Sequence, residues 1–167
     1  MPRREGALVG ELFSGTVYQA QRGSGAFRNG KSCHVSTTTH IENCFLGMNF
    51  DERDLTTLHK LIIQQPVPSK VRRTGSSAMD IVYVASGAYD AFVDIGNILT
   101  AESFLAALSI VLEAGGIVSD QHGNNLHPIT NLTEGFSLVV AGTAQLHQEL
   151  LAKINPNPNY ELVHSII

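Results

Sequence analysis

The chain has few charged side chains and no run of basic residues. Asp, Glu, Lys and Arg make up 16% of its 167 residues, against about 25% in an average soluble protein. A nucleic-acid-binding surface needs a basic stripe that releases counterions from the phosphates. Because the net charge is −4 and Arg3-Arg4 and Arg72-Arg73 are the largest basic clusters, we expect no nucleic-acid partner. The low charge also suggests a surface that is buried against a second subunit or a further domain.

Cysteine and long apolar runs are equally scarce. Cys33 and Cys44 have no Cys-x-x-Cys spacing, and we interpret them as small buried apolar side chains without a disulfide. The longest apolar stretch, Phe104 to Leu112, is interrupted by Ser109 and is too short to cross a membrane. No His-x-x-x-His pair occurs, so we expect no zinc site. Without a signal peptide, the expected location is cytoplasmic and away from membranes.

The N-terminal residues contain β-hairpin signals. Glu11 to Gln21 is rich in Phe, Thr, Val and Tyr, which predicts one strand. Gly23-Ser24-Gly25 then turns the chain, and Asn29-Gly30 is the strongest short signal for a hairpin turn. An isolated hairpin is only marginally stable. We therefore expect residues 1–40 to form a β-hairpin flank that packs on a larger sheet.

From Ile41 onward, the pattern changes to alternating strands and helices, which predicts a layered α/β unit over residues 41–167. The expected strands cover residues 44–50, 89–93, 117–119 and 136–141. The expected helices begin at four caps, namely Asp51, Ser77, Thr100 and Thr143. For the first helix the expected core face is Leu55, Leu58 and Ile62; for the third it is Phe104, Leu105, Leu108, Val111 and Leu112.

Three motifs together resemble those of the inositol monophosphatase family. The first covers residues 11–30 and contains Ala20 and Gly23-Ser24-Gly25-Ala26-Phe27-Arg28-Asn29-Gly30. The second runs from Arg72-Arg73-Thr74-Gly75-Ser76-Ser77-Ala78-Met79-Asp80 to Asp90 and Asp94. The third is Glu113-Ala114-Gly115-Gly116 with Asp120 and Gly123 after it. Because order and spacing match across most of the chain, the sequence is similar to the back part of this family, and most similar to its archaeal-type members.

This resemblance implies a magnesium-dependent, lithium-sensitive phosphatase of inositol phosphates, fructose bisphosphate or related small phosphates, commonly a homodimer. Residues 1–40 would be the β-hairpin remnant of the family's first domain. Residues 41–167 would be its α/β C-terminal domain, of the sugar-phosphatase type. The family's first domain holds the metals with a glutamate and an Asp-Pro-x-Asp-Gly-Thr segment, and no such segment occurs in this sequence. We therefore expect that catalytic domain to be missing here.

The family also places a metal-binding aspartate in the second domain, where this chain has Ser103. A neutral hydroxyl is a poor ligand for a hard cation such as Mg²⁺. The neighbouring Glu102 points about 100° away around a helix. Metal-assisted hydrolysis needs carboxylates that converge on the cations. We therefore predict no tightly bound magnesium and no catalytic residue in this chain alone.

Substrate-binding residues can still be predicted. Gly75, Ser76 and Ser77 precede a helix, whose N-terminus favours anions and hydroxyl groups; alternatively, Ser77 only caps that helix. Asp94 corresponds to an acidic residue that binds sugar hydroxyls in the family, and the alternative is a solvated strand end. Arg72 is a candidate for binding a second phosphate. The expected ligand is a small phosphorylated polyol or sugar.

Other polar residues of the motifs have simpler interpretations. Arg73 is a second candidate for a phosphate contact, although exposed arginines are common. We interpret Asp90 and Glu113 as structural, and Asp80 as a carboxylate in the first turn of a helix, where the helix dipole stabilises it.

Two functions remain open at this stage. The chain is either part of a phosphatase that needs its first domain in cis or in trans, or a non-catalytic relative that binds a ligand or forms a homodimer. Ser103 favours the second, because truncation alone would not remove an aspartate from the retained part. An unrelated α/β small-molecule binder would not explain the three motifs.

Overall fold

The computed structural model describes residues 6–53 and 55–156, and its N-terminal part is an antiparallel four-stranded sheet. The strands are β1 (Gly6–Glu11), β2 (Thr16–Gln21), β3 (Gly25–Arg28) and β4 (Lys31–Cys33), in that order. Asn29 and Gly30 join β3 to β4 with φ angles of 49° and 75°, as a tight hairpin turn requires. The predicted hairpin is therefore present within a larger sheet.

The prediction of one strand from Glu11 to Gln21 is wrong, because residues 12–15 form a turn between β1 and β2. Gly15 has a φ of 70°, which a strand does not allow. Its N–H donates to the Glu11 carbonyl at 2.9 Å. The Ser14-Gly15 pair is a turn signal, and the β-branched and aromatic residues around it outweighed it in the sequence analysis.

The second sheet has five strands in the order β6-β5-β7-β9-β8. They are β5 (Phe45–Met48), β6 (Lys70–Arg72), β7 (Ala91–Thr100), β8 (Ile117–Ser119) and β9 (Gly135–Ala141). Strand β5 is parallel to β6 and β7, whereas β9 is antiparallel to β7 and β8. Most of β7 and β9 is buried, as expected for central strands that are covered on both faces.

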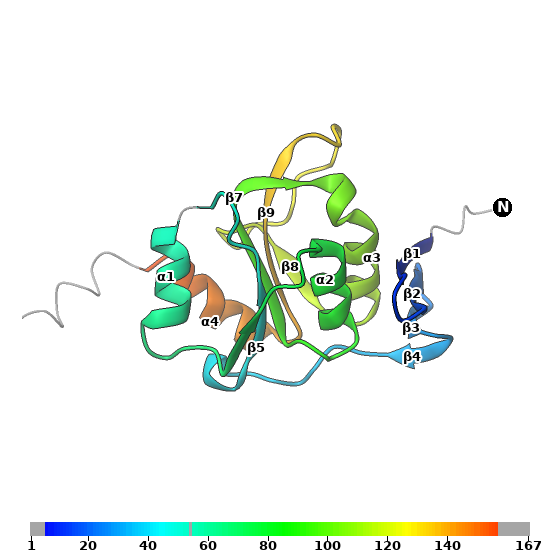
Figure 1. Ribbon diagram of the computed structural model, residues 1–167, viewed down its shortest axis with the longest axis horizontal. Coiled ribbons are helices and arrows are strands. Elements are labelled where there is room, and N and C mark those ends of the chain that lie inside the picture. The colour runs from blue at the N-terminus through cyan, green and yellow to red at the C-terminus, as the bar shows by residue number, and fades with distance from the viewer. Residues whose placement is uncertain (1–5, 54, 157–167) are drawn as a thin grey trace, which may run out of the picture.

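Helices cover both faces of this sheet. They are α1 (Leu55–Ile63), α2 (Ser77–Ala85), α3 (Leu105–Glu113) and α4 (Ala144–Ile154), with short 3₁₀ turns η1 (Ile41–Asn43) and η2 (Ala101–Ser103). As Figure 1 shows, α1 and α4 lie on one face, α2 and α3 on the other, and the four-stranded sheet packs outside α2 and α3. These alternating layers confirm the predicted α/β class. The two sheets lie on either side of residue 40, and the division into two domains stays a prediction.

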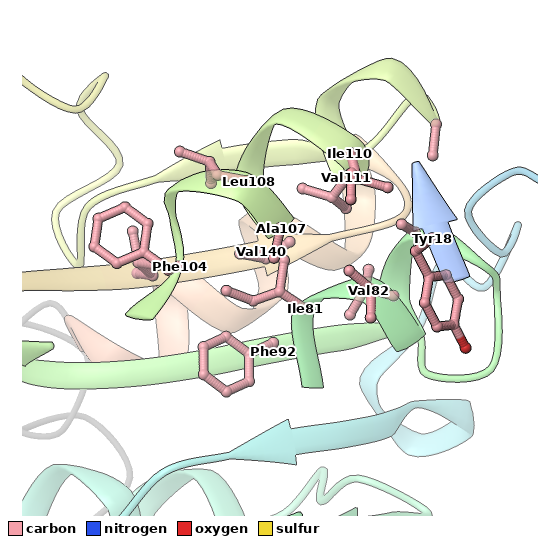
Figure 2. Close-up of a cluster of buried hydrophobic side chains, with 14 of the residues drawn as sticks. Tyr18, Ile81, Val82, Phe92, Phe104, Ala107, Leu108, Ile110, Val111 and Val140 are labelled. Carbon is pink, nitrogen blue, oxygen red and sulfur yellow. The ribbon is translucent and has the colours of Figure 1, made fainter. Parts of the chain in front are cut away.

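Two apolar clusters hold these layers together. The larger lies on the α2 and α3 side, and Figure 2 shows Phe92 and Val140 from the sheet with Ile81 and Val82 of α2, while Tyr18 reaches the cluster from β2. Each of these side chains is at most 1% exposed, and burying one large apolar side chain stabilises a fold by about 1.5–3 kcal/mol. The second cluster includes Leu46, Leu58, Leu61, Val93, Val139, Leu146 and Leu150.

The predicted helices are present, but two of the predicted core faces are partly wrong. In α1, Leu58 and Leu61 are buried, whereas Leu55 is 64% exposed and Ile62 is 37% exposed. The helix begins after the turn that contains Asp51, rather than directly at this residue, and its buried side packs toward α4. Within the described residues, no helix has the length and apolar character that a membrane crossing needs.

In α3, Leu105 and Leu112 are 41% and 51% exposed, and Ala107 and Ile110 are buried in their place. The predicted cap at Thr100 is also wrong, because this residue precedes η2 and makes no capping hydrogen bond. The α3 segment is apolar on nearly every side, and it packs against both α2 and the four-stranded sheet. Periodicity alone therefore could not define its buried face.

Candidate ligand-binding site

Polar side chains gather beyond the C-terminal end of β5, beside β7 and the N-terminus of α2. Asn49 directly follows β5, and Asp94 lies in β7 just before a break in its pairing with β9. The connection from β5 through α1 to β6 and the return through α2 to β7 run on opposite faces of the sheet. Open α/β sheets bind ligands at the carboxyl ends of strands where the direction of winding changes in this way.

Asp94 is completely buried, and protein groups occupy both of its carboxylate oxygens. Its Oδ1 accepts a hydrogen bond from Arg53 Nε at 2.8 Å, and its Oδ2 accepts one from Arg53 Nη2 at 2.9 Å. Asn49 Nδ2 also donates to Oδ2 at 2.9 Å. The Arg53 side chain is itself only 6% exposed. Asp94 is therefore not the solvated strand end that was the alternative interpretation.

Asn49 links this ion pair to α2. Its Nδ2 donates to the Ser77 hydroxyl at 3.0 Å as well as to Asp94, and its Oδ1 accepts a hydrogen bond from Arg73 Nε at 3.1 Å. Ser77 is 8% exposed. The amide of Asn49 thus brings together side chains from β7, α2 and the segment after β6.

The turn before α2 presents two exposed residues, Gly75 and Ser76. The prediction that Ser77 caps α2 is wrong, because Ser76 is the N-cap and its Oγ accepts a hydrogen bond from the Met79 N–H at 3.4 Å. Gly75 has a φ of 88°, which leaves Ser76 extended and places Ser77 as the first helical residue. The hydroxyl of Ser77 is therefore available for the contact with Asn49.

The predicted first-turn carboxylate of α2 is confirmed at Asp80. Its side chain is buried and accepts a hydrogen bond from the Thr74 N–H at 3.3 Å. Burial raises the pKa of Asp80 above its usual range, although the hydrogen bonds from Thr74 act in the opposite direction. Asp80 thereby fixes the turn that leads into α2.

The neighbouring side chains of Arg72 and Arg73 make different contacts. Arg72 donates to the Val71 carbonyl at 2.9 Å, and its guanidinium lies 5.7 Å from the centre of the Phe45 ring. Arg73 instead bonds to Asn49 and forms an ion pair with Asp51. The structure thus brings Gly75, Ser76, Ser77 and Asp94 together with Arg73, and it places Arg72 outside this set of contacts.

Asn49 and Arg53 were missed in the sequence analysis. Asn49 lies near the end of the strand predicted for residues 44–50, and Arg53 follows that strand. This position was the available signal, since loops at the carboxyl ends of parallel strands carry binding residues. Their partner Asp94 lies more than 40 residues away in the chain. Local sequence spacing therefore does not indicate that Asn49 and Arg53 contact Asp94.

The described residues do not fit a magnesium site by themselves. Ser103 is exposed at the end of η2, and the neighbouring Glu102 is exposed and accepts a hydrogen bond from Thr100 Oγ1. Over residues 6–53 and 55–156, no three His, Cys, Asp or Glu side chains are grouped so that they could hold a metal ion. The carboxylates of Asp94 and Asp51 each face an arginine.

Other polar residues of the motifs support the fold. Asp90 Oδ2 accepts a hydrogen bond from the Phe45 N–H at 2.6 Å. The carboxylate of Glu113 accepts hydrogen bonds from the N–H groups of Gly23 and Gly25 at 2.9 and 3.0 Å, and these bonds lower the pKa of Glu113. Cys33 and Cys44 are free thiols.

Comparison with known proteins places these features in a family. Residues 5–158 match the model of the inositol monophosphatase family. The fructose-1,6-bisphosphatase/inositol-1-monophosphatase of Methanothermobacter thermautotrophicus is 33% identical over 144 residues, which are 86% of this chain and 50% of that protein. The Nus factor SuhB of Escherichia coli is 33% identical over 156 residues, which are 91% of this chain and 55% of that protein.

Solved structures with the same fold are also related to this family. A Pyrococcus horikoshii protein with similarities to inositol-1 monophosphatase has a TM-score of 0.77 and 25% identity, over 90% of this chain and 57% of its own. The extragenic suppressor protein suhB from Bartonella henselae has a TM-score of 0.76 and 27% identity, over 91% of this chain and 57% of its own. This chain spans about half the length of the curated relatives that it matches. With the family model matched over residues 5–158, the chain belongs to the inositol monophosphatase family.

Proposed function

We propose that this chain binds a phosphorylated polyol or sugar at the polar edge formed by Asn49, Arg73 and Gly75–Ser77, as the substrate-binding part of a site of the inositol monophosphatase type. The observation that supports it best is the Asn49 amide, which joins Ser77, Asp94 and Arg73 at the N-terminus of α2. Hydroxyl, amide and guanidinium groups beside a helix N-terminus suit a ligand that carries both a phosphate and hydroxyl groups.

Hydrolysis belongs, in this proposal, to a complete site and not to this chain alone. Phosphate ester cleavage with metal ions needs carboxylates that hold the cations beside the substrate. The magnesium requirement of the family would then be met mainly by residues of a first domain, supplied in cis or in trans. The chain alone would bind magnesium weakly and release no phosphate.

The second candidate is a non-catalytic ligand-binding or dimerisation module that keeps the family fold. Ser103 favours it, because this exposed serine lies within the part of the family fold that the chain retains. The ion pair between Asp94 and Arg53 also favours this second candidate, since a carboxylate already paired with an arginine is not available to a metal cation.

Restoring the missing carboxylate separates the two candidates. The variant Ser103→Asp, mixed with the first domain of a catalytically active relative, would be assayed with magnesium for phosphate release from inositol 1-phosphate and fructose 1,6-bisphosphate. Ser109→Asp is the matched control, because Ser109 is also exposed and lies in α3 nearby. Lithium-inhibited turnover that only Ser103→Asp strengthens would support the phosphatase. Absence of turnover in every combination would support the binding module.

A pair of arginine variants tests the proposed binding site directly. We expect Arg73→Ala to weaken the binding of inositol 1-phosphate by about tenfold or more, since a hydrogen bond to a charged group is worth about 1.5–3 kcal/mol. Arg72→Ala is the control. It removes the same charge at the neighbouring residue, whose side chain lies over Phe45 and outside the proposed site. Equal loss of affinity in the two variants would show a general charge effect and refute the proposed site.

A further inference from the structure

The ion pair between Arg53 and Asp94 blocks the group that would otherwise bind ligand hydroxyls. A carboxylate offers about four lone-pair positions, and Arg53 and Asn49 occupy three of those of Asp94. The Asp94 side chain is 0% exposed. A polyol hydroxyl therefore cannot reach its remaining position while Arg53 stays in place.

Arg53 is held firmly in this place. Its Nη1 donates to the Asp51 carbonyl at 2.7 Å, while Nε and Nη2 form the two-pronged contact with Asp94. A two-pronged arginine–carboxylate contact fixes geometry as well as charge. A ligand that needed Asp94 would have to break these bonds before it could bind.

The charges that remain toward solvent favour an anion. Arg73 is exposed and lies beside the turn of Gly75 and Ser76 that begins α2, and the N-terminal end of a helix carries partial positive charge. Asp51 is already paired with Arg73, as Asp94 is with Arg53. The site thus offers donors to a phosphate, whereas the Asp94 carboxylate is closed to a neutral polyol and the exposed Asp51 carboxylate is paired with Arg73.

We propose that Arg53 is the positioning residue that sets the specificity of this site: by holding Asp94 it excludes neutral polyols and leaves recognition to the phosphate of the ligand. This inference rests on the proposed binding function. It reassigns Asp94 from a direct contact with sugar hydroxyls to an anchor for Arg53. It also makes the ratio of affinities for phosphorylated and neutral ligands the property that Arg53 controls.

Calorimetry with the full chain in excess EDTA tests this, with myo-inositol and inositol 1-phosphate as probes. We expect the wild type to bind inositol 1-phosphate about tenfold or more tightly than myo-inositol, and Arg53→Ala to bind myo-inositol about tenfold more tightly than the wild type. Arg53→Lys keeps a positive charge opposite Asp94 but lacks the planar fork of the guanidinium. Its affinity for myo-inositol should therefore lie between those of the wild type and Arg53→Ala. Arg53→Lys also serves as the second variant if Arg53→Ala does not fold.

The double variant Arg53→Ala/Asp94→Ala is the matched control, and it should lose the gain because it has no carboxylate to free. If Arg53 had a purely structural role, its loss would weaken the binding of both ligands together and leave their affinity ratio unchanged, and this result would overturn the inference. A gain in affinity for myo-inositol that persists in the double variant, which lacks Asp94, would also overturn it. Failure of the wild type to bind inositol 1-phosphate would instead refute the proposed function, and the response of myo-inositol to Arg53→Ala would still report on Arg53 separately.

Discussion

The buried pair of Arg53 and Asp94 should couple strongly in folding stability. Asp94 is 0% exposed and the Arg53 side chain 6% exposed, so neither charge can be rehydrated easily if its partner is lost. Removing one partner of a buried ion pair costs about 3–5 kcal/mol, because the remaining charge is uncompensated. We therefore expect Asp94→Ala to lower the free energy of unfolding by about 3–5 kcal/mol. At about 2–4 °C per kcal/mol for a chain of this size, the melting temperature falls by roughly 6–20 °C.

Urea denaturation of a double-mutant cycle measures the coupling. Arg53→Met should also destabilise the protein, but Arg53→Met/Asp94→Ala should lose about 1–3 kcal/mol less than the sum of the single changes, since it leaves no unpaired charge. The pair of Arg73 and Asp51 is the control, with side chains 30% and 58% exposed, and its coupling should stay below about 1 kcal/mol. If the Arg53 and Asp94 changes added within about 0.5 kcal/mol, the reasoning would be refuted.

Three further changes have defined outcomes. Gly135→Ala should cost about 3 kcal/mol or more in urea denaturation, because the added Cβ would overlap the Asn97 carbonyl oxygen. Tyr83→Phe should cost about 1 kcal/mol by removing the hydrogen bond to Glu11. Burial and this bond raise the pKa of Tyr83 from 10.0 to about 12, so the stabilisation is complete below pH 10 and is lost as the pH rises towards 12. Glu113→Gln should speed amide hydrogen exchange at the backbone N–H groups that Glu113 binds. It should also remove a stabilisation of the wild type that is present above pH 4.5 and is lost as the pH falls through the lowered folded-state pKa of Glu113.

Each of these changes has a control or a contrary result. Gly10→Ala should leave stability within about 0.5 kcal/mol, because a Cβ at Gly10 meets no atom within 4 Å. Absorbance that showed Tyr83 ionising at pH 10 would contradict the effect of its burial. Exchange at Gly23 and Gly25 that did not change in Glu113→Gln would mean that Glu113 does not tie the hairpin sheet to α3.

Local turn and cap chemistry made much of the fold predictable. Asn29-Gly30 gave the turn between β3 and β4, and Thr143 caps α4 as predicted, since its Oγ1 accepts a hydrogen bond from the Leu146 N–H. Errors arose where two local signals competed, as at Ser14-Gly15. They also arose where an apolar helix packs on more than one side, as α3 does, because its periodicity then does not mark a single buried face.

The site was predictable only where one motif contains several of its parts. Gly75, Ser76 and Ser77 adjoin one another, so their place at a helix N-terminus follows from local sequence. The partners of Asp94 come from the segment after β5 and are set by sheet order, which the sequence analysis did not define. The choice between Arg72 and Arg73 likewise depends on where β6 ends, because Arg72 is its last residue and Arg73 belongs to the segment that leads to α2.

Titration of inositol 1-phosphate into the purified 167-residue chain in excess EDTA, followed by calorimetry, tests the central claim most directly. Because the proposed contacts come from Asn49, Arg73 and the turn before α2, and not from a metal ion, we predict saturable binding that the chelator does not change. Binding that appears only when magnesium is added, or no binding under either condition, would contradict the claim.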